Sequence, residues 1–469
     1  MNLNNKEIVM KTVAENGWNL KFVPDNFRND KDVVLTAVKR DGSALQFASD
    51  SLRDNKEIVR EAIKNYHWAL KYASERLKDN KEVVMEAVKL EGYMLEFASD
   101  RLKNDKDIVL RAIENNIKSI RYVGNNIRNN KEIMNIAIED NGWNLEYASD
   151  ELKDDKEFVM KAIEKDSNVA MWASDRLKND LDIVKKCIKQ HGNNILKYTN
   201  DEIRDNKEIM LEAVKVDGWA LQFASDRLRN DKEIALTALD NFNLTLKFVS
   251  DRLKDDFDIV IKSVAKNGLR LNRASDRLKN NKDIVMTAVK EDYRALEYAS
   301  NNLKNDKDVV LEAIKLEGYM LEFASDRLKN DKDVVLTAVR NDGGALQFAS
   351  DNMKDNEEIV MEAIKNNPKS LKFASSRLRD NKYFVIIAVE NYGETLEYAS
   401  PRLQDDKDIV LKAVKQNGWE LEWASDRLKN DKEVVLEAVK RNKYAFRNYA
   451  GDELKEQYPT VEDLLASEN

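Results

Sequence analysis

A 25-residue motif is repeated along almost the whole chain, and this repetition constrains the fold more than any other feature. With Lys31 as position 1, the reference copy reads KDVVLTAVKRDGSALQFASDSLRDN and ends at Asn55. Eighteen copies fill residues 6–456, and the copy that begins at Leu181 has 26 residues because of one extra residue near Asn193-Asn194. A single copy is too small to bury the apolar surface that would stabilise it alone, so we predict an array of stacked copies.

Each copy begins with the pattern of an amphipathic helix. Positions 3, 4, 7 and 8 are apolar or small, as in Val33, Val34, Ala37 and Val38. Asp or Asn at positions 24 and 25, followed by an acid at position 2, indicates an N-cap with a capping box or with an acid that meets the helix dipole. Glycine at position 12, present in eleven copies, indicates a left-handed residue that ends the helix.

A second, shorter helix follows in each copy, as at residues 44–48. Position 17 is aromatic in sixteen copies, and position 22 is an apolar anchor for the turn into the next copy. Position 7 is always small, which lets neighbouring helices approach closely. The predicted fold is all-α: one continuous superhelical solenoid of about eighteen 25-residue helix-turn-helix repeats over residues 1–451, followed by a C-terminal capping helix and tail at residues 452–469. Glycine at position 12 often alternates with another residue, which leaves nine 50-residue pairs as an alternative unit.

The composition excludes several other classes of protein. Hydrophobic residues make up 42% of the chain, too many for a disordered protein. The single cysteine, Cys187, excludes a disulfide framework and suits a reducing compartment. No stretch of 18 apolar residues is present for a membrane span, and the first residues lack the apolar run of a signal peptide. We therefore expect a cytoplasmic protein without a membrane partner, and the net charge of -8 argues against a broad nucleic-acid-binding surface.

The repeated pattern DKE[IV]V…A[VI]…NG…AL.[FY]AS..L closely resembles the tandem repeats of the domain-of-unknown-function 4116 family. The resemblance covers nearly the whole chain and about twenty positions of each copy. It implies a helical-repeat protein of a kind seen in protists, large viruses and some bacteria, with no catalytic residues attached to the motif. If such a chain is encoded by a virus or a pathogen, its compartment is the cytoplasm of the host cell.

Few residues suggest catalysis or metal binding. Cys187 and His191 lie four residues apart, a spacing that can bring a nucleophile and a base together on one helix face. However, Cys187 occupies the small position 7, and both His191 and His67 occupy helix-end positions. The Asp/Asn turns lack the central glycine and the distant glutamate of a calcium-binding loop. We expect no enzymatic activity, no metal and no cofactor.

Basic residues recur at two positions of the repeat. Position 23 is Lys or Arg in sixteen of the first seventeen copies, and Arg often occupies position 21. Stacked copies align these residues into a ladder that suits phosphate groups. Acids at positions 2, 20, 24 and 25 interleave with the ladder, so we expect short-range ion pairs that neutralise it and that serve solubility and spacing.

Position 13 is the best candidate for recognition. It tolerates Trp, Gly and Lys in different copies, so it is not deep core, and we expect its aromatic residues to be half-buried at a helix start. The alternative is that these rings only cover the edge of the core. Arg270 and Arg273 replace expected residues in one copy, and Asn193-Asn194 lengthen another, as sites where a binding surface has been tailored. The candidate partner-binding residues are Trp18, Trp68, Tyr93, Trp143, Trp219, Arg270, Arg273, Tyr319 and Trp419.

These features predict a non-enzymatic scaffold that binds another protein along its concave surface, with aromatic anchors and a charged rim. A second hypothesis, which follows from the resemblance and the charge, is an inhibitor that blocks a host defence enzyme, such as a nuclease, by direct binding. A nucleic-acid binder that uses the Lys/Arg ladder is the third.

Overall fold

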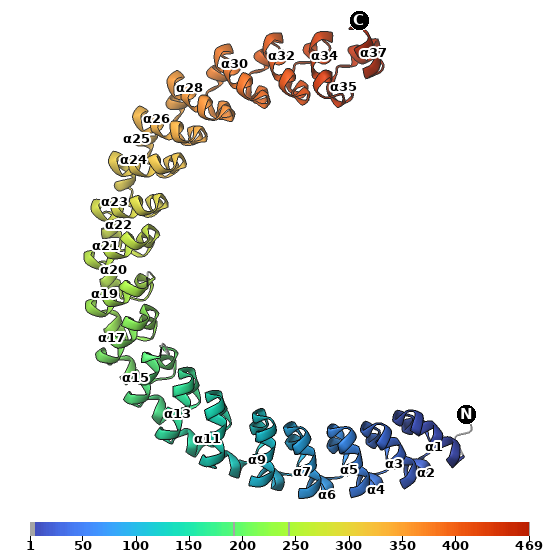
Figure 1. Ribbon diagram of the computed structural model, residues 1–469. Helices are drawn as coiled ribbons and strands as arrows, with labels where there is room; N and C mark the ends of the chain where they lie inside the picture. The colour runs from blue at the N-terminus through green and yellow to red at the C-terminus, as the bar shows by residue number, and fades with distance from the viewer. Residues whose placement is uncertain (1–4, 191–192, 243, 469) are drawn as a thin grey trace. The chain divides into compact units, whose positions relative to one another are not determined.

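The computed structural model describes residues 5–190, 193–242 and 244–468, and it divides into two units, Met1–Leu228 and Arg229–Asn469. Most repeats contribute a ten-residue α-helix, a six-residue 3-10 helix and a four-residue α-helix, as in Lys31–Arg40, Gly42–Phe47 and Asp50–Arg53 (Figure 1). The predicted all-α repeat fold is confirmed, and the described residues contain no β-strand. The predicted second, shorter helix is present as a 3-10 helix, a form that occurs mostly in short segments.

The long α-helices of the first unit all begin at position 1 of a repeat. They are α1 (Lys6–Glu15), α3 (Lys31–Arg40), α5 (Lys56–Asn65), α7 (Lys81–Leu90), α9 (Lys106–Asn115), α11 (Lys131–Asp140), α13 (Lys156–Lys165), α15 (Leu181–Lys189) and α17 (Lys207–Val216). Those of the second unit are α19 (Lys232–Asn241), α21 (Phe257–Lys266), α23 (Lys282–Glu291), α24 (Lys307–Leu316), α26 (Lys332–Asn341), α28 (Glu357–Asn366), α30 (Lys382–Asn391), α32 (Lys407–Gln416) and α34 (Lys432–Arg441).

The 3-10 helices follow the long helices after one extended residue in most repeats. In the first unit they are η1 (Gly17–Phe22), η2 (Gly42–Phe47), η3 (His67–Tyr72), η4 (Gly92–Phe97), η5 (Ile117–Tyr122), η6 (Gly142–Tyr147), η7 (Ser167–Trp172), η8 (Asn193–Lys197) and η9 (Gly218–Phe223). In the second unit they are η10 (Thr245–Lys247), η11 (Gly268–Arg273), η12 (Tyr293–Tyr298), η14 (Gly318–Phe323), η15 (Gly343–Phe348), η16 (Pro368–Phe373), η17 (Gly393–Tyr398) and η18 (Gly418–Trp423).

A single helical turn then connects most repeats to the next. These turns are α2 (Asp25–Arg28), α4 (Asp50–Arg53), α6 (Glu75–Lys78), α8 (Asp100–Lys103), α10 (Asn125–Arg128), α12 (Asp150–Lys153), α14 (Asp175–Lys178), α16 (Asp201–Arg204) and, at the division between the units, α18 (Asp226–Arg229). The second unit has α20 (Asp251–Lys254), α22 (Asp276–Lys279), η13 (Leu303–Asn305), α25 (Asp326–Lys329), α27 (Asp351–Lys354), α29 (Ser376–Arg379), α31 (Pro401–Gln404) and α33 (Asp426–Lys429).

Three short helices follow the last long helix: α35 (Tyr444–Tyr449), α36 (Asp452–Gln457) and α37 (Val461–Ala466). Helix α35 takes the place of a 3-10 helix, and α37 packs against α34. The segment for which the sequence predicts one capping helix and a tail thus contains two short helices.

The polar residues at the helix boundaries cap the N-termini of the long helices and of the 3-10 helices. The side chain of Asp30, at position 25, accepts hydrogen bonds from the backbone N–H groups of Asp32 and Val33. At the other end Asp41, at position 11, has extended backbone angles, and its side chain accepts from the N–H of Ser43 at a distance of 2.9 Å. One residue therefore ends the long helix and caps the 3-10 helix. The acid at position 2 is the second residue of the helix, so it does not form the capping box that the sequence suggested.

In most copies where position 12 is glycine, the next repeat approaches it closely, and this finding corrects the prediction of a left-handed residue. None of the described glycines has a φ angle in the left-handed region. A Cβ atom built on Gly42 would lie 2.2 Å from the carbonyl oxygen of Ala62 in the next repeat, and one on Gly418 would lie 2.2 Å from that of Ala438. In most of the copies that have glycine at position 12, that residue touches position 7 of the next repeat, which is small in every copy.

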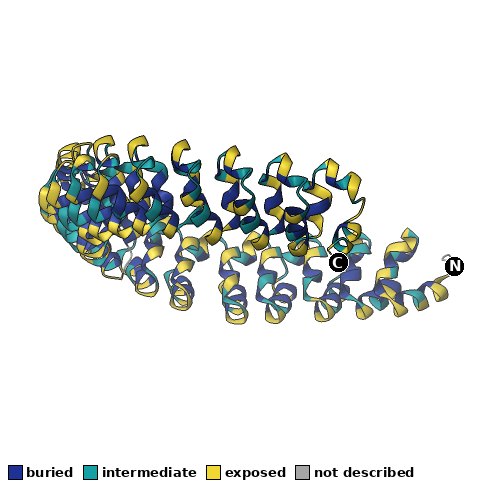
Figure 2. Cartoon of the chain, turned by 90° about the horizontal axis from the view of Figure 1, so that it is seen from above, coloured by how far each residue is buried: buried dark blue, intermediate teal, exposed yellow. Residues whose placement is uncertain are grey.

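Within each unit the core lies between a row of long helices and a row of 3-10 helices. Most long helices contact the long helices of their neighbours as well as their own and the preceding 3-10 helix, as α3 contacts α1, α5, η1 and η2. Val33, Val34, Val38 and Leu45 are fully buried in this space. Figure 2 shows the buried residues on the inner sides of the helices and the exposed residues on their outer turns. Stability thus comes from contacts between neighbours, as in other solenoids.

Candidate interaction surface

The aromatic residues at position 13 lie at the second residue of their 3-10 helices and are half-buried. Trp18 is 44% exposed, Trp143 41% and Trp419 40%, whereas the apolar residue at position 15, such as Leu20, is fully buried. Trp68 and Tyr93 are somewhat more covered, and Trp219 and Tyr319 resemble Trp419 in exposure. Every aromatic residue that the sequence singled out at this position therefore presents part of its ring to solvent. Their role in partner binding stays a prediction.

Four of these rings pack against the aromatic residue at position 17 of the next repeat, and Trp419 packs against Tyr449 at position 18. The ring centroids of Trp18 and Phe47 are 5.3 Å apart and nearly perpendicular, and those of Trp419 and Tyr449 are 5.7 Å apart. The remaining pairs with this geometry are Trp68 with Phe97, Tyr93 with Tyr122, and Tyr319 with Phe348. Edge-to-face pairs of this kind are favourable beyond the area they bury. The sequence did not indicate this pairing, because the partner lies in another repeat.

Hydrogen bonds between repeats hold two of the tryptophans in place. The indole N–H of Trp18 donates to the hydroxyl oxygen of Ser43 at 2.8 Å, and that of Trp143 donates to a carboxylate oxygen of Asp166 at 2.9 Å. The backbone N–H of Asn168 and the indole of Trp143 hold the pKa of Asp166 below its usual range. A ring that is already fixed loses little conformational entropy when a partner covers it.

The arginines at position 21 are occupied by bonds to the preceding repeat. Nε of Arg76 donates to the carboxylate of Asp54 at 3.0 Å, and Nη2 donates to the Asp54 carbonyl oxygen at 2.8 Å. The hydroxyl of Ser74 and the guanidinium of Arg76 lower the pKa of Asp54. The same pattern occurs at Arg101, Arg176, Arg227, Arg277, Arg377, Arg402 and Arg427. The predicted neutralisation is therefore confirmed for these eight arginines, whereas Arg252 and Arg327 donate to the side-chain oxygens of Asn230 and Asn305.

A second ladder explains the acid at position 2. Lys156, at position 1, lies 2.8 Å from Asp180 and 2.6 Å from Asp182, the N-cap and position 2 of the following helix. Lys307 pairs in the same way with Asp331 and Asp333. Exposed pairs of this kind contribute about 0.2–1 kcal/mol each, so their main effect is to fix the register of adjacent repeats. The basic residues at position 23 have two kinds of partner. Lys178 lies 3.2 Å from Asp175 at position 20 of its own repeat, whereas Nζ of Lys153 is 5.9 Å from the centroid of the Trp172 ring in the next repeat.

Arg270 and Arg273 are close together on η11. Arg270 is half-buried at position 14, where most repeats place a small or apolar residue, and Arg273 is exposed in place of the usual aromatic ring. Within the described residues the Nε atom of Arg270 has no hydrogen-bond partner. Burial lowers the pKa of Arg270, and the charge of Arg273 adds to this effect. Asn193, at the lengthened repeat, is buried, and its side-chain amide donates to the carbonyl of Ala213 at 3.3 Å.

Glu420 is a buried charged group that the sequence analysis missed. It is only 3% exposed at position 14 of its repeat, and the side-chain amide of Asn417 donates to it at 2.8 Å. Burial, together with the negative charge of Glu394, raises the pKa of Glu420 to about 7. The sequence could have indicated this site, because Glu420 and Arg270 are the two charged residues found at position 14 among the copies.

The described residues that were considered for catalysis are buried or packed against their neighbours. Cys187 is buried, its thiol lies 3.6 Å from the carbonyl oxygen of Ser167, and burial raises its pKa to about 12, so the thiolate nucleophile is scarce near neutral pH. His191 lies outside the described residues. His67 begins η3, and its ring stacks on Tyr66. Among the described residues no three His, Cys, Asp or Glu side chains are placed to hold a metal ion, and no helix is long and apolar enough to cross a membrane.

The family model described as Domain of unknown function (DUF4116) matches the chain in overlapping segments of about two repeats. Matches begin 25 residues apart over much of the chain, as at 5–53, 30–78 and 55–103, and the last ends at residue 455. The chain belongs to the DUF4116 family. No curated protein matches it. Position 13 varies among the copies of this chain, whereas the capping and core positions are nearly constant.

Proposed function

We propose that this DUF4116 chain is a non-enzymatic scaffold that binds a partner protein through the position-13 aromatic residues. The observation that carries the proposal is the half-exposed, pre-fixed state of rings such as Trp18, Trp143 and Trp419. Partly exposed Trp and Tyr side chains are enriched among the residues that dominate binding energy in protein interfaces. The buried, weakly acidic Cys187 supports the non-catalytic role and fits a reducing compartment such as the cytoplasm.

The regular composition of the repeat also supports recognition at this position. The capping, core and ion-pair positions carry nearly the same residues in every copy, since each has a fixed task in the stack. Position 13 instead carries Ser43, Lys118, Gly344 or an aromatic ring. The residue at position 13 can change without loss of the fold. The set of copies that carry an aromatic ring there can therefore determine which partner binds. An inhibitor of an enzyme would use this same surface.

The experiment starts from a partner that copurifies stoichiometrically with the tagged chain from its native cells and is identified by mass spectrometry. Affinity is then measured by calorimetry for the purified pair. Replacing Trp18, Trp68 and Trp143 with serine, the residue at position 13 in the reference copy, is expected to weaken binding at least about 30-fold, because one hot-spot aromatic residue is worth about 2 kcal/mol or more.

A matched control removes exposed apolar surface from the other row of helices. Ile136→Glu alters a 43% exposed residue at position 6, where Glu61 and Glu86 occur in other copies. It is expected to leave the affinity unchanged. Equal losses in the tryptophan variant and the control, or an unchanged affinity in the tryptophan variant with its helical content intact, contradict the proposal.

We expect little binding to nucleic acid, because the arginines of position 21 already bond to carboxylates and carbonyls of the preceding repeat. Fluorescence anisotropy with a labelled oligonucleotide should give a Kd no tighter than about 10⁻⁴ M at physiological salt, the weak end of non-specific binding. Tight binding that falls steeply with added salt and is reduced by Arg101→Gln would instead show that the ladder contacts phosphates.

A further inference from the structure

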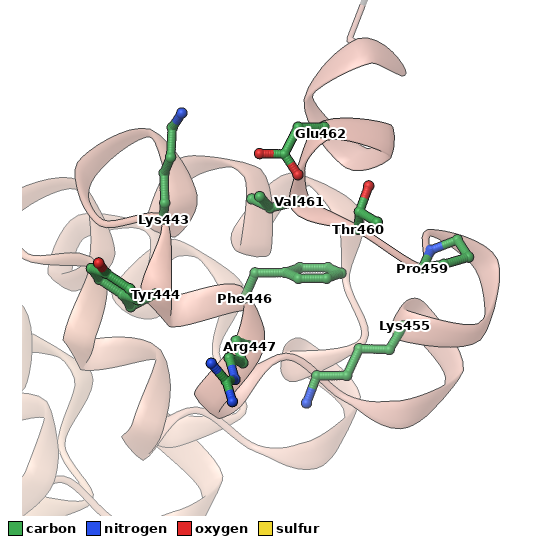
Figure 3. Close-up of a pocket in the computed structure, with 9 residues that line it drawn as sticks. All are labelled: Lys443, Tyr444, Phe446, Arg447, Lys455, Pro459, Thr460, Val461 and Glu462. Atoms are coloured by element: carbon green, nitrogen blue, oxygen red, sulfur yellow. The ribbon is translucent and has the colours of Figure 1, made fainter.

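A cavity of about 620 Å³ lies among the three short helices that follow the last long helix. Its apolar lining comes from Tyr444 and Phe446 of α35, and from Pro459 and Val461 at the start of α37. Figure 3 shows the ring of Phe446 in the middle of the lining residues, with Val461 across from it, and because Phe446 is only 5% exposed its ring forms part of the cavity floor. Cavities of this size with a mostly apolar lining and a few polar groups are typical of sites for small ligands.

The charged residues around the cavity are mostly basic. Arg447 and Lys455 lie on one side of the Phe446 ring, Glu462 lies on the opposite side, and Lys443 stands at the rim (Figure 3). None of the three cations forms an ion pair with a carboxylate in the part of the chain that the structure describes. This contrasts with the repeats, where most lysines at position 1 and most arginines at position 21 have acidic partners, as Lys156 and Arg76 do.

We propose that this cavity binds an organic carboxylate with an apolar or aromatic body. Arg447 and Lys455 hold the carboxylate, since the planar guanidinium matches the two carboxylate oxygens and the ammonium adds a second positive charge. Phe446 and Val461 cover the apolar body. The chemistry is shared by free aromatic acids and by the last residue of a polypeptide, and Tyr444 is the one position-13 aromatic residue among the residues that line the cavity.

The proposal is tested with the full chain and N-acetyl-L-phenylalanine, followed by saturation-transfer NMR and calorimetry. The acid should bind, and N-acetyl-L-phenylalaninamide, which lacks the carboxylate, should bind at least about tenfold more weakly. The double variant Arg447→Gln, Lys455→Gln should weaken binding of the acid by a similar factor and leave binding of the amide unchanged. A short peptide that ends in a free phenylalanine is measured as well, with its amidated form as the control. If this peptide binds more tightly than N-acetyl-L-phenylalanine, the ligand is the end of a polypeptide, and if it binds more weakly, the ligand is a free acid.

Lys415→Gln is the matched control, because Lys415 is an exposed lysine of the same unit and does not line the cavity. It should bind the acid as the wild type does. Thermal unfolding of each variant shows whether the terminal helices remain folded. Absence of binding at millimolar acid, equal affinity for acid and amide, or an unchanged affinity in the folded double variant overturns the proposal.

Discussion

Gly42→Ala is expected to lower the local free energy of unfolding around the second and third repeats by about 2–3 kcal/mol. The new Cβ atom would lie 2.2 Å from the carbonyl oxygen of Ala62 and 2.8 Å from Cβ of Tyr66, so the stack has to open. The shift also strains the hydrogen bond from the N–H of Gly42 to the side-chain oxygen of Asn65, which is 3.0 Å long. Native-state hydrogen exchange with mass spectrometry resolves the effect repeat by repeat.

Gly393→Ala is the matched control at the same repeat position. Its Cβ atom would lie 3.2 Å from the carbonyl oxygen of Ala413, a distance that a small adjustment relieves. The loss of conformational freedom in the unfolded chain favours alanine by about 0.4–1 kcal/mol, so the net change is expected to be near zero. Equal destabilisation in the two variants would show that glycine serves backbone conformation at position 12 and not close approach.

The sequence predicted the long helices well, because the spacing of apolar residues within ten residues determines them. Val33, Val34, Ala37 and Val38 mark the buried face of α3 (Lys31–Arg40), and the N-cap Asp30 lies where the polar pair at positions 24 and 25 indicated. The 3-10 form of the next segment was not predictable in this way. Six residues with apolar positions three apart fit an α-helical turn and a 3-10 helix equally well.

The predictions that failed mostly concerned contacts between repeats. When every copy has the same sequence pattern, the pattern does not show whether a residue contacts its own repeat or a neighbouring one. An acid at position 2 suits the helix dipole of its own helix, yet Asp182 pairs with Lys156 of the preceding repeat. Likewise Gly42 suggested a local backbone requirement, whereas the constraint comes from Ala62. At position 13 the tolerance for unlike residues was enough to predict half-burial, but the ring partner at position 17 of the next repeat was not visible.

Glu420→Gln is expected to stabilise the last repeats at pH 8 by at most about 3 kcal/mol and to change little near pH 4.5. Ionised Glu420 is buried near Glu394 and Glu397 of η17, Glu422 of η18 and Tyr449 of α35, and its pKa in the folded chain is about 7 against 4.5 for an ordinary glutamate. Between these two values the folded state keeps a proton that the unfolded state has lost. The free energy of unfolding therefore falls as pH rises from about 4.5 to 7 and then levels off.

The difference between wild type and variant is measured by urea unfolding at both pH values, with hydrogen exchange over residues 393–449 to locate it. Glutamine keeps the shape of the side chain and an acceptor for the Asn417 amide, which isolates the effect of charge. Glu453→Gln, at an exposed position of α36, is the control and should show no such pH dependence. If Glu420→Gln destabilises the chain equally at both pH values, Glu420 is held there by its hydrogen bond in the ionised form, and burial does not keep it protonated.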